Sequence, residues 1–325
     1  MRLQLIPAEQ IPDLLPMLDA AEAMKRAFAA LSAGQVVAPN RMHLPAKGSE
    51  DCALLMGALV PGEAFATKIV SIFHSNAHRG LPVVTGLVTI LDPETGEPAG
   101  LCDAGPLTAW RTGATSGAAT DLLALPGARI GSVFGSGAQA RTQLLAIDAV
   151  RDLEEIRVFG PEPDAVAAMI EELQDRTRAE LTEVADSAAA VDGADVICTA
   201  TSSPVPVFDG ALLKPGAHVN AIGTYTLDRR ELDVETVGRA RVFVDLVAAA
   251  LEEAGELVHG IEAGITNAAE WTEIGDVASG RAAGRRDPTE ITVFKTVGHA
   301  VQDAVTAALL LDAVRQTGAA RELEL

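Results

Sequence analysis

Hydrophobic residues recur along the chain with two different spacings, and the spacing changes from one part to the next. In residues 11–32 apolar side chains recur every three or four positions, which predicts an amphipathic helix. Pro16 suits its first turn and Gly34 its end. Short apolar runs follow at 53–60, 65–73, 86–92 and 99–105, separated by turn signals. A helix followed by several strands predicts an α+β module.

The second half of the chain alternates between strand-like and helix-like segments. A helix is predicted over 107–125, with Thr108 as its N-cap. Strands are predicted at 128–135, 156–160, 194–201, 217–223 and 240–245, and helices at 138–150 and 163–173. This alternation predicts a parallel sheet with helices on its faces. A last helix, over 298–315, is expected to pack back on the first module.

A glycine cluster lies between the predicted strand at 128–135 and the helix after it. Gly135, Gly137 and Ala140 form the pattern G-x-G-x-x-A. The first glycine permits a tight turn, the second allows a pyrophosphate to approach the backbone, and the small third residue lets helix and strand pack. Together with the helix N-terminus this predicts a dinucleotide site. The alternative is an ordinary tight turn.

The end of the next predicted strand bears on the choice of dinucleotide. It reads VFGPEPD, with Gly160 at the strand end and Glu162 two residues later. An acid here bonds the ribose hydroxyls of NAD, whereas NADP enzymes commonly offer Arg. The segment has no basic residue, which favours NAD, with Glu162 as the candidate ligand. NADP stays open, and Glu162 could equally be a solvated loop residue.

Charge limits the possible partners and makes a few cations conspicuous. The 325 residues include 45 acidic and 25 basic ones, a formal net charge of −20, so we expect neither nucleic acid nor membrane as a partner. Lys68 shares a strand face with Ala66 and Val70 and is expected to meet a buried carboxylate, from ligand or protein, unless it lies on an edge strand. Arg111, one turn past Thr108, suits bidentate carboxylate binding or a surface ion pair.

Other candidate chemistry is weak. His74 and His78 lie four apart, but their segment reads as a loop and no third ligand is apparent, so no metal site is expected. Ser116 lacks the G-x-S-x-G pattern of a hydrolase. Three widely spaced cysteines, no signal peptide and no apolar run of about 20 residues predict a cytoplasmic protein without a membrane span.

Four stretches, in order, resemble the ornithine cyclodeaminase/mu-crystallin family. They are GLVTILDPETGEPAGLCDAGPLTAWRTGATSGAAT, GSGAQA, ADVICTATSSPVPVFDGALLKPGAHVNAIG and EITVFKTVGHAVQDAV. The resemblance spans nearly the whole chain and implies an α/β subunit of two domains that forms a homodimer. A Rossmann NAD(P)-binding domain would cover 121–298. An α+β substrate-binding and dimerisation domain would cover 1–120, with 299–325 packing on it and the site in the cleft between the domains.

The resemblance also implies roles for individual residues. Arg41, Lys68 and Arg111 fall where the cyclodeaminases hold the carboxylate of the amino acid. The implied cofactor contacts, besides Gly135, Gly137 and Glu162, are Ala138, Gln139, Thr201, Val219, Asn220, Ala221, Ile222 and Thr296. Val297 would lie near nicotinamide and substrate.

One departure from the cyclodeaminase pattern bears on the reaction. The Asp that handles the substrate amine in the cyclodeaminases is replaced, by spacing from Glu231, by Tyr225, and Asp228 follows three residues later. This run is more similar to relatives that reduce cyclic imino acids and to mu-crystallin. We therefore predict an NAD(P)H-dependent oxidoreductase, a ketimine reductase acting on a small, cyclic 2-imino acid, with Lys68, Tyr225 and Asp228 as catalytic candidates.

The alternatives are an ornithine cyclodeaminase, which forms proline and ammonia, and an alanine or other amino-acid dehydrogenase. A crystallin-like protein that binds a ligand without turnover is a further, non-enzymatic alternative.

Overall fold

Tertiary contacts divide the chain into two compact units. The computed structural model describes residues 2–49, 51–319 and 321–324. The first unit comprises Met1–Arg111 and His299–Leu325, and the second comprises Thr112–Gly298. The chain passes from the first to the second inside helix α3, Ala104–Leu123.

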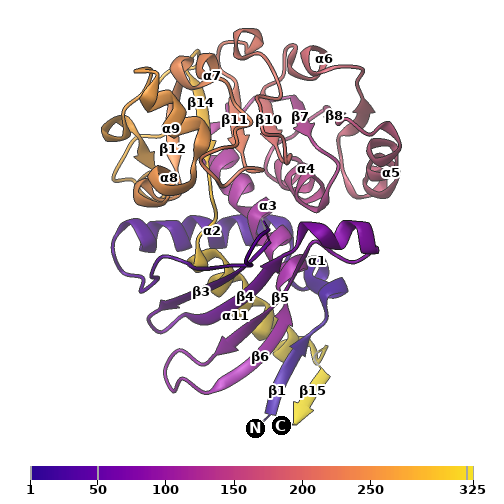
Figure 1. The fold of residues 1–325 in the computed structure, drawn as a ribbon, viewed down its shortest axis with the longest axis vertical. Coiled ribbons are helices and arrows are strands. Elements are labelled where there is room, and N and C mark those ends of the chain that lie inside the picture. The colour runs from indigo at the N-terminus through magenta and orange to yellow at the C-terminus, as the bar shows by residue number, and fades with distance from the viewer. Residues whose placement is uncertain (1, 50, 320, 325) are drawn as a thin grey trace. The chain divides into compact units, whose positions relative to one another are not determined.

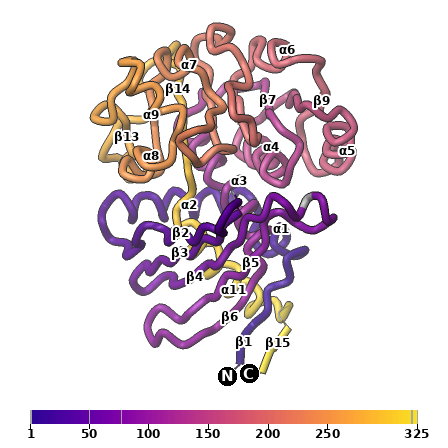
Figure 2. The backbone as a smooth tube through the Cα atoms, in the orientation of Figure 1, coloured from indigo at the N-terminus to yellow at the C-terminus, as the bar shows by residue number. Residues whose placement is uncertain are grey.

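The first unit is built on a seven-stranded sheet with the order β15-β1-β6-β5-β4-β3-β2. The strands are β1 Arg2–Ile6, β2 Met42–Pro45, β3 Cys52–Val60, β4 Ala64–Ile72, β5 Val84–Leu91, β6 Pro98–Asp103 and β15 Arg321–Glu324. The four apolar runs predicted as strands are β3 to β6. The sequence did not predict β2, nor the terminal strands β1 and β15, which pair antiparallel where the two ends of the chain meet (Figure 2).

Helices cover one face of this sheet. They are α1 Ile11–Leu14, α2 Met17–Ser32 and α11 Ala300–Thr317, with short 3-10 turns at Ala8–Gln10 and His74–Arg79. The predicted helix over 11–32 is interrupted at Pro16, which precedes α2 as its N-cap, because a proline ring cannot continue the helix before it. Helix α11 packs on the sheet, against β3, β4 and β5, and against α2 (Figure 1).

The second unit contains an eight-stranded sheet in which every strand pair is parallel, as predicted. Its order is β13-β12-β14-β11-β10-β7-β8-β9. The strands are β7 Ile130–Phe134, β8 Glu155–Phe159, β9 Glu180–Glu183, β10 Val196–Thr199, β11 His218–Ala221, β12 Ala240–Val244, β13 Thr272–Glu273 and β14 Ile291–Lys295. The strand order reverses between β7 and β10, the position where ligands bind in open parallel sheets.

Two apolar layers cover the two faces of this sheet. Val133 and Cys198 pack with α4 (Ala138–Val150) and α5 (Pro163–Leu173) in one cluster, while their neighbours Phe134 and Ile197 pack with α6 (Ser187–Val191) in another. This is the alternation expected of strands buried on both faces. The helices of the unit are α4 Ala138–Val150, α5 Pro163–Leu173, α6 Ser187–Val191, α7 Val234–Arg239, α8 Val247–Glu253, α9 Gly255–Glu262 and α10 Ile274–Ala278, with 3-10 turns at Gln174–Arg176, Gly210–Leu212 and Ala268–Glu270.

Among the helices in the described part of the chain, none is both long and apolar enough to cross a membrane.

Candidate active site

The glycine turn after β7 has the geometry that its sequence predicts. Gly135 has a φ of 111°, a conformation that side chains other than glycine rarely adopt. A Cβ at this position would lie 2.6 Å from the carbonyl oxygen of Ala200, in the loop that follows β10. Gly135 is therefore required for the close approach of these two loops.

Gly137 is constrained differently, and the space around it fits a phosphate. It is the N-cap residue of α4, contributes no side-chain cap, and a Cβ built there would meet nothing within 4 Å. The first backbone N–H groups of α4 therefore point to an open, exposed position, the arrangement that binds a pyrophosphate. Ala138 is exposed, and among the described residues the buried Oε1 of Gln139 has no hydrogen-bond partner. These features suit the dinucleotide that the sequence predicts.

The segment after β8 contains Gly160 and the candidate ribose ligand Glu162. Gly160 directly follows the strand, and a Cβ there would lie 3.1 Å from Cγ2 of Val166 and 3.8 Å from Oγ of Ser136, in the glycine turn. Glu162 is the exposed N-cap residue of α5 and is followed by Pro163 at the first helical position. Glu162 is therefore exposed and lies two residues beyond a glycine that approaches the glycine turn, a position open to a ribose.

A buried acid that the sequence reasoning missed joins the loops after β10 and β11. Oε1 of Glu231 accepts hydrogen bonds from the N–H and hydroxyl of Thr201, at 2.6 and 2.8 Å. Oε2 accepts from the N–H of Gly223 at 2.6 Å and from the hydroxyl of Thr199 at 3.0 Å. Thr201, the predicted nicotinamide-side residue, is thus held by Glu231.

Three of the four residues predicted to touch the cofactor along β11 lie inside the sheet. Val219, Asn220 and Ala221 are fully buried, and Nδ2 of Asn220 donates to the hydroxyl of Thr120 at 2.9 Å. Ile222 is the first residue beyond the strand. Because these three side chains are buried within the sheet, a cofactor could reach them only if the sheet rearranged. Ile222 is therefore the better candidate of the four for a cofactor contact.

A second buried acid organises the segment after β14. Oδ2 of Asp245 accepts from the hydroxyl of Thr296 at 2.6 Å and from the N–H groups of Val297 and Gly298 at 3.0 and 3.1 Å. Thr296 and Val297 directly follow β14, so they lie at the carboxyl edge of the parallel sheet. The loops after β7, β8, β10 and β11 lie at the same edge. This edge gathers the predicted cofactor residues that follow strands.

In the first unit, Lys68 and Arg111 meet at one buried carboxylate, that of Asp303. Nζ of Lys68 lies 2.7 Å from Oδ2, and Nε of Arg111 lies 3.1 Å from Oδ1. The three side chains come from β4, α3 and α11 and are 3%, 6% and 2% exposed. Lys68 also donates to the hydroxyl of Thr108 at 3.3 Å, and Arg111 donates to Oε1 of Gln302. The protein acid that the burial of Lys68 required is Asp303.

The charges of this group shift its pKa values. Burial lowers the pKa of Lys68 to about 8, an effect that Asp303 opposes and that Arg111 and Arg41 increase. Burial disfavours ionised Asp303, but Lys68 and Arg111 outweigh that effect and hold the pKa of its carboxyl below the usual range. Two cations and one anion are thus buried together, with Arg41 close enough to contribute. This local positive charge suits an anionic ligand.

The predicted start of the helix that carries Arg111 is wrong. α3 begins at Ala104, directly after β6, and Thr108 lies inside it rather than at its N-cap. The carboxylate of Asp103 accepts from the N–H of Gly105 at 2.8 Å and so satisfies a donor at the true start. Arg111 is therefore two turns into the helix, and its orientation depends on Asp303 and Gln302 rather than on a helix N-terminus.

The other two catalytic candidates, Tyr225 and Asp228, lie in the loop after β11. Both are exposed in the second unit. The neighbouring Thr226 side chain holds the pKa of Asp228 below its usual range, so this exposed carboxylate has no proton to donate at neutral pH. Nearby, buried Lys295 contacts Glu256 at 3.0 Å and donates to the carbonyl of Thr224 at 2.6 Å, which anchors the start of this loop.

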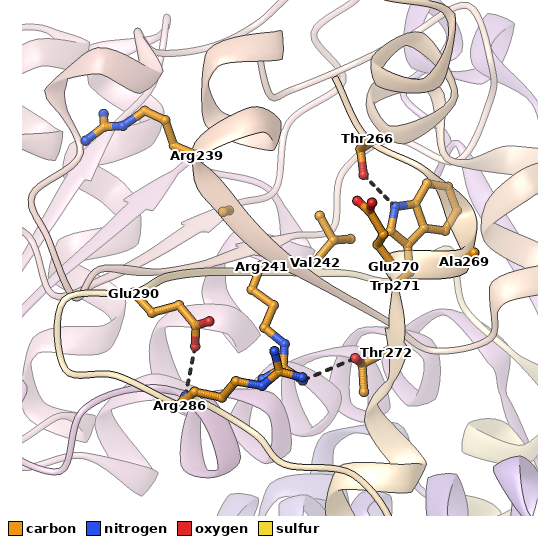
Figure 3. Close-up of a pocket in the computed structure, with 11 residues that line it drawn as sticks. Arg239, Arg241, Val242, Thr266, Ala269, Glu270, Trp271, Thr272, Arg286 and Glu290 are labelled. Carbon is orange, nitrogen blue, oxygen red and sulfur yellow. Dashed lines mark hydrogen bonds between the residues drawn. The ribbon is translucent and has the colours of Figure 1, made fainter. Parts of the chain in front are cut away.

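A cavity of about 650 Å³ lies elsewhere in the second unit, at the amino ends of β12 and β14 (Figure 3). Arg241 faces Thr272 and donates to the carbonyl oxygens of Ala283 and Gly284, whereas Arg239 points away and bonds other carbonyls. These arginines hold loops together. None of the residues singled out from the sequence lines this cavity.

Within the described residues, no group of three or more His, Cys, Asp or Glu side chains is arranged to hold a metal ion. His74 and His78 lie in the 3-10 turn His74–Arg79 rather than in an irregular loop.

Comparison with known proteins shows the family of the chain. The family model described as "Ornithine cyclodeaminase/mu-crystallin family" matches residues 4–318. The chain belongs to this family. A Delta(1)-pyrroline-2-carboxylate reductase of Bacillus cereus is 34% identical over 322 residues, which cover 98% of this chain and 99% of the relative.

Solved structures of other family members share the fold. A Delta(1)-pyrroline-2-carboxylate reductase of Thermococcus litoralis, in complex with NADH and L-proline, superposes with a TM-score of 0.93 at 32% identity. The match covers 98% of this chain and 99% of that one. An archaeal alanine dehydrogenase dimer with bound NAD superposes with a TM-score of 0.91 at 28% identity over the full length of both chains. The predicted α/β class with a Rossmann-type sheet is confirmed, and these relatives bind NADH or NAD.

Proposed function

We propose that this protein is an NADH-dependent reductase of a cyclic 2-imino acid, with a five-membered ring as the first candidate substrate. The observation that carries the proposal is the buried group of Lys68, Arg111 and Asp303, which has more positive than negative charge inside a strongly acidic molecule. The full-length similarity to two pyrroline-2-carboxylate reductases supports the choice of substrate class.

In this proposal the first unit binds the carboxylate of the substrate. Lys68 and Arg111 would donate charge-assisted hydrogen bonds to it, and Arg41 would add positive charge from the segment before β2. The rigid setting of Lys68 in the middle of β4 and of Arg111 in α3 would fix the orientation of the ring, so that its imine carbon occupies one defined position.

The second unit would hold NADH at the carboxyl edge of its sheet. The N–H groups at the start of α4 would bind the pyrophosphate, and Glu162 would accept from the adenosine ribose. Glu231 and Asp245 would keep Thr201 and Thr296 in place beside the nicotinamide. When bound, the cofactor supplies a hydride for the imine carbon.

The imine nitrogen of the substrate receives its proton from a side chain or from solvent. A protonated iminium accepts hydride directly, so the chain mainly has to align the substrate and exclude water. Lys68, whose pKa is lowered to about 8, can carry a proton at neutral pH and release it more readily than an ordinary lysine. Tyr225 is the second candidate, whereas Asp228 would act through its charge.

A homodimer through the open face of the first sheet completes the proposal. Met42, Leu55, Ile69 and Leu87 are successive partners across β2, β3, β4 and β5. Three of them are strongly exposed, at 58%, 58% and 56% for Met42, Ile69 and Leu87. An apolar row of this kind on a sheet favours a protein interface. Sedimentation of Ile69→Glu beside the unchanged protein tests it: the variant should sediment as a monomer.

A cytoplasmic location also belongs to the proposal. Cys52, Cys102 and Cys198 are buried free thiols, which suits a reducing compartment.

Absorbance at the NADH band tests the reaction. Five- and six-membered cyclic 2-imino carboxylates should each oxidise NADH, the preferred ring giving the higher kcat/KM. Ornithine should give no proline, because Tyr225 stands where the cyclodeaminases have an acid for the side-chain amine. Proline and ammonia formed from ornithine without net NADH change would identify a cyclodeaminase instead. NAD⁺ reduction with alanine would identify a dehydrogenase, and tight cofactor binding without any turnover would favour a binding protein.

A further inference from the structure

Asp303 lies between the two cations of the proposed carboxylate site and forms ion pairs with both of them. Each of its two oxygens serves a different cation: Oδ2 contacts Nζ of Lys68 at 2.7 Å and Oδ1 contacts Nε of Arg111 at 3.1 Å. It lies in the first turn of α11, where His299 and Gln302 form a capping box that fixes the start of the helix. Oε1 of Gln302 also accepts from Arg111, so the same turn holds the guanidinium twice.

The surroundings of Lys68 make Asp303 the acid that governs its charge. Among the described residues, the titratable groups that act on or sit beside Lys68 are Arg41 from the segment before β2, Cys102 from β6, Arg111 from α3 and Asp303 from α11. The two arginines disfavour a further positive charge. Burial raises the pKa of Cys102 to about 12, so its thiol is neutral. Of these groups, Asp303 alone favours the protonated ammonium.

We propose that Asp303 is a positioning residue of the substrate site: its carboxylate keeps Lys68 protonated and holds Lys68 and Arg111 in one orientation, leaving the trio a single positive charge for one substrate carboxylate. This inference rests on the proposed function for the identity of the ligand. Without Asp303, two cations would share a buried space and Lys68 would lose its proton at lower pH. The site would then bind carboxylate with one cation fewer around neutrality.

Titration of a ligand into the NADH-saturated protein tests this role. Pyrrole-2-carboxylate is a suitable probe, because it is a flat five-membered ring with one carboxylate and no group that titrates between about pH 6 and pH 10. With the unchanged protein, its Kd should rise above a pH near 8, as Lys68 loses its proton. With Asp303→Asn this rise should begin about 1–3 pH units lower. Lys68→Arg should remove the rise, since arginine stays protonated throughout.

The matched control is Asp312→Asn, a mostly exposed acid on the same helix that pairs with Arg315. It should leave the whole pH profile unchanged. If Asp303→Asn does not fold, as judged by circular dichroism and thermal unfolding, Asp303→Glu decides: it should keep the rise of the Kd near the original pH while weakening the binding of the probe at every pH.

A flat profile in the unchanged protein, a folded Asp303→Asn with the original profile, or a shifted profile in Asp303→Glu would each overturn the inference. The titration needs no turnover. Failure of the protein to reduce cyclic imines would therefore refute the proposed function. The role of Asp303 could still be tested from the pH dependence of the Kd of the probe.

Discussion

Nζ of Lys68 lies 2.7 Å from a carboxylate oxygen of Asp303, and both side chains are almost wholly buried. Removing two charges from water is costly, and their mutual attraction repays that cost only in part. Because Arg111 shares the same acid, the pair is not neutral as a group. This residual positive charge in a chain with a net charge of −20 is the physical basis of the proposed carboxylate site.

Removal of the Lys68 ammonium should strongly reduce catalysis without weakening cofactor binding. Lys68→Ala removes one charge-assisted hydrogen bond, worth about 1.5–3 kcal/mol, and misplaces the ring, so kcat/KM should fall by about 100-fold or more. The Kd for NADH, measured by fluorescence, should stay unchanged, because Lys68 and the glycine turn lie in different units. Lys47→Ala, at an exposed lysine of the same unit, is the control. Full turnover by Lys68→Ala would remove Lys68 from the mechanism.

Alanine substitutions at the two glycines of the turn should change different properties. Gly137→Ala should weaken NADH binding, and Gly135→Ala should lower the stability of the second unit. Gly137→Ala meets nothing within 4 Å, so its free energy of unfolding should stay within about 1 kcal/mol, while its methyl group blocks the pyrophosphate and weakens NADH binding by about 10-fold or more. Gly135→Ala has an unfavourable φ and a contact of 2.6 Å, so it should destabilise the second unit itself. Unchanged NADH affinity in a folded Gly137→Ala would contradict the assignment of the turn.

Glu162 should set the preference for NADH over NADPH. A carboxylate that accepts from the ribose hydroxyls contributes about 1.5–3 kcal/mol and repels a 2′-phosphate. Glu162→Ala should therefore reduce the ratio of the two kcat/KM values by about 10- to 100-fold. Glu171→Ala, an exposed acid on the same helix α5, provides the comparison. Equal ratios in both variants would show that Glu162 is only a solvated cap residue.

His218 should make the second unit less stable in acid. Burial, with a smaller effect of Arg285, lowers the pKa of His218 to about 3, and its ring bonds Thr292 and Asn220. The unfolded chain takes up this proton below about pH 6.5 and the folded one does not, so stability is full above that pH and falls as pH drops toward 3.

Between about pH 7.5 and 4.5 the contribution of His218 corresponds to a loss of roughly 2–3 kcal/mol. Urea unfolding at both pH values measures it. His218→Gln, although less stable overall, should lose less free energy of unfolding on acidification than the unchanged protein, by roughly 2–3 kcal/mol. His259→Gln, a variant at a half-buried histidine beside Glu262, should behave like the unchanged protein. Identical pH sensitivity in all three proteins would contradict a neutral buried His218.

The regular elements that could be predicted are those with a strong local signal, and β9, β13, β14 and the helices α6 to α10 were not among them. The helix over 138–150 was placed to the residue, since the glycine turn marks its start and its apolar periodicity continues to the end. Short β1 and β15 were missed because each is stable only by pairing with a distant segment. The start of α3 was misplaced because Asp103, which satisfies its first turn, directly follows a strand and reads as part of it.

The candidate site could be predicted only as far as its cations. Lys68 and Arg111 stood out because positive charge is scarce and their surroundings apolar. Asp303 was missed: one acid in an acidic chain carries little information, although its position in the apolar stretch HAVQDAV was a usable signal. Glu231 and Asp245 act on loops far from them in sequence, and no spacing rule connects an acid to such partners.

The reduction itself is tested most directly by following deuterium from NADH labelled at C4 of the nicotinamide into proline. With Δ1-pyrroline-2-carboxylate as the substrate, we expect one NADH to be consumed for each proline formed, with the deuterium at C2 of the product. Proline formed from ornithine with release of ammonia and no net NADH consumption, with the cyclic imine left unreduced, would contradict it.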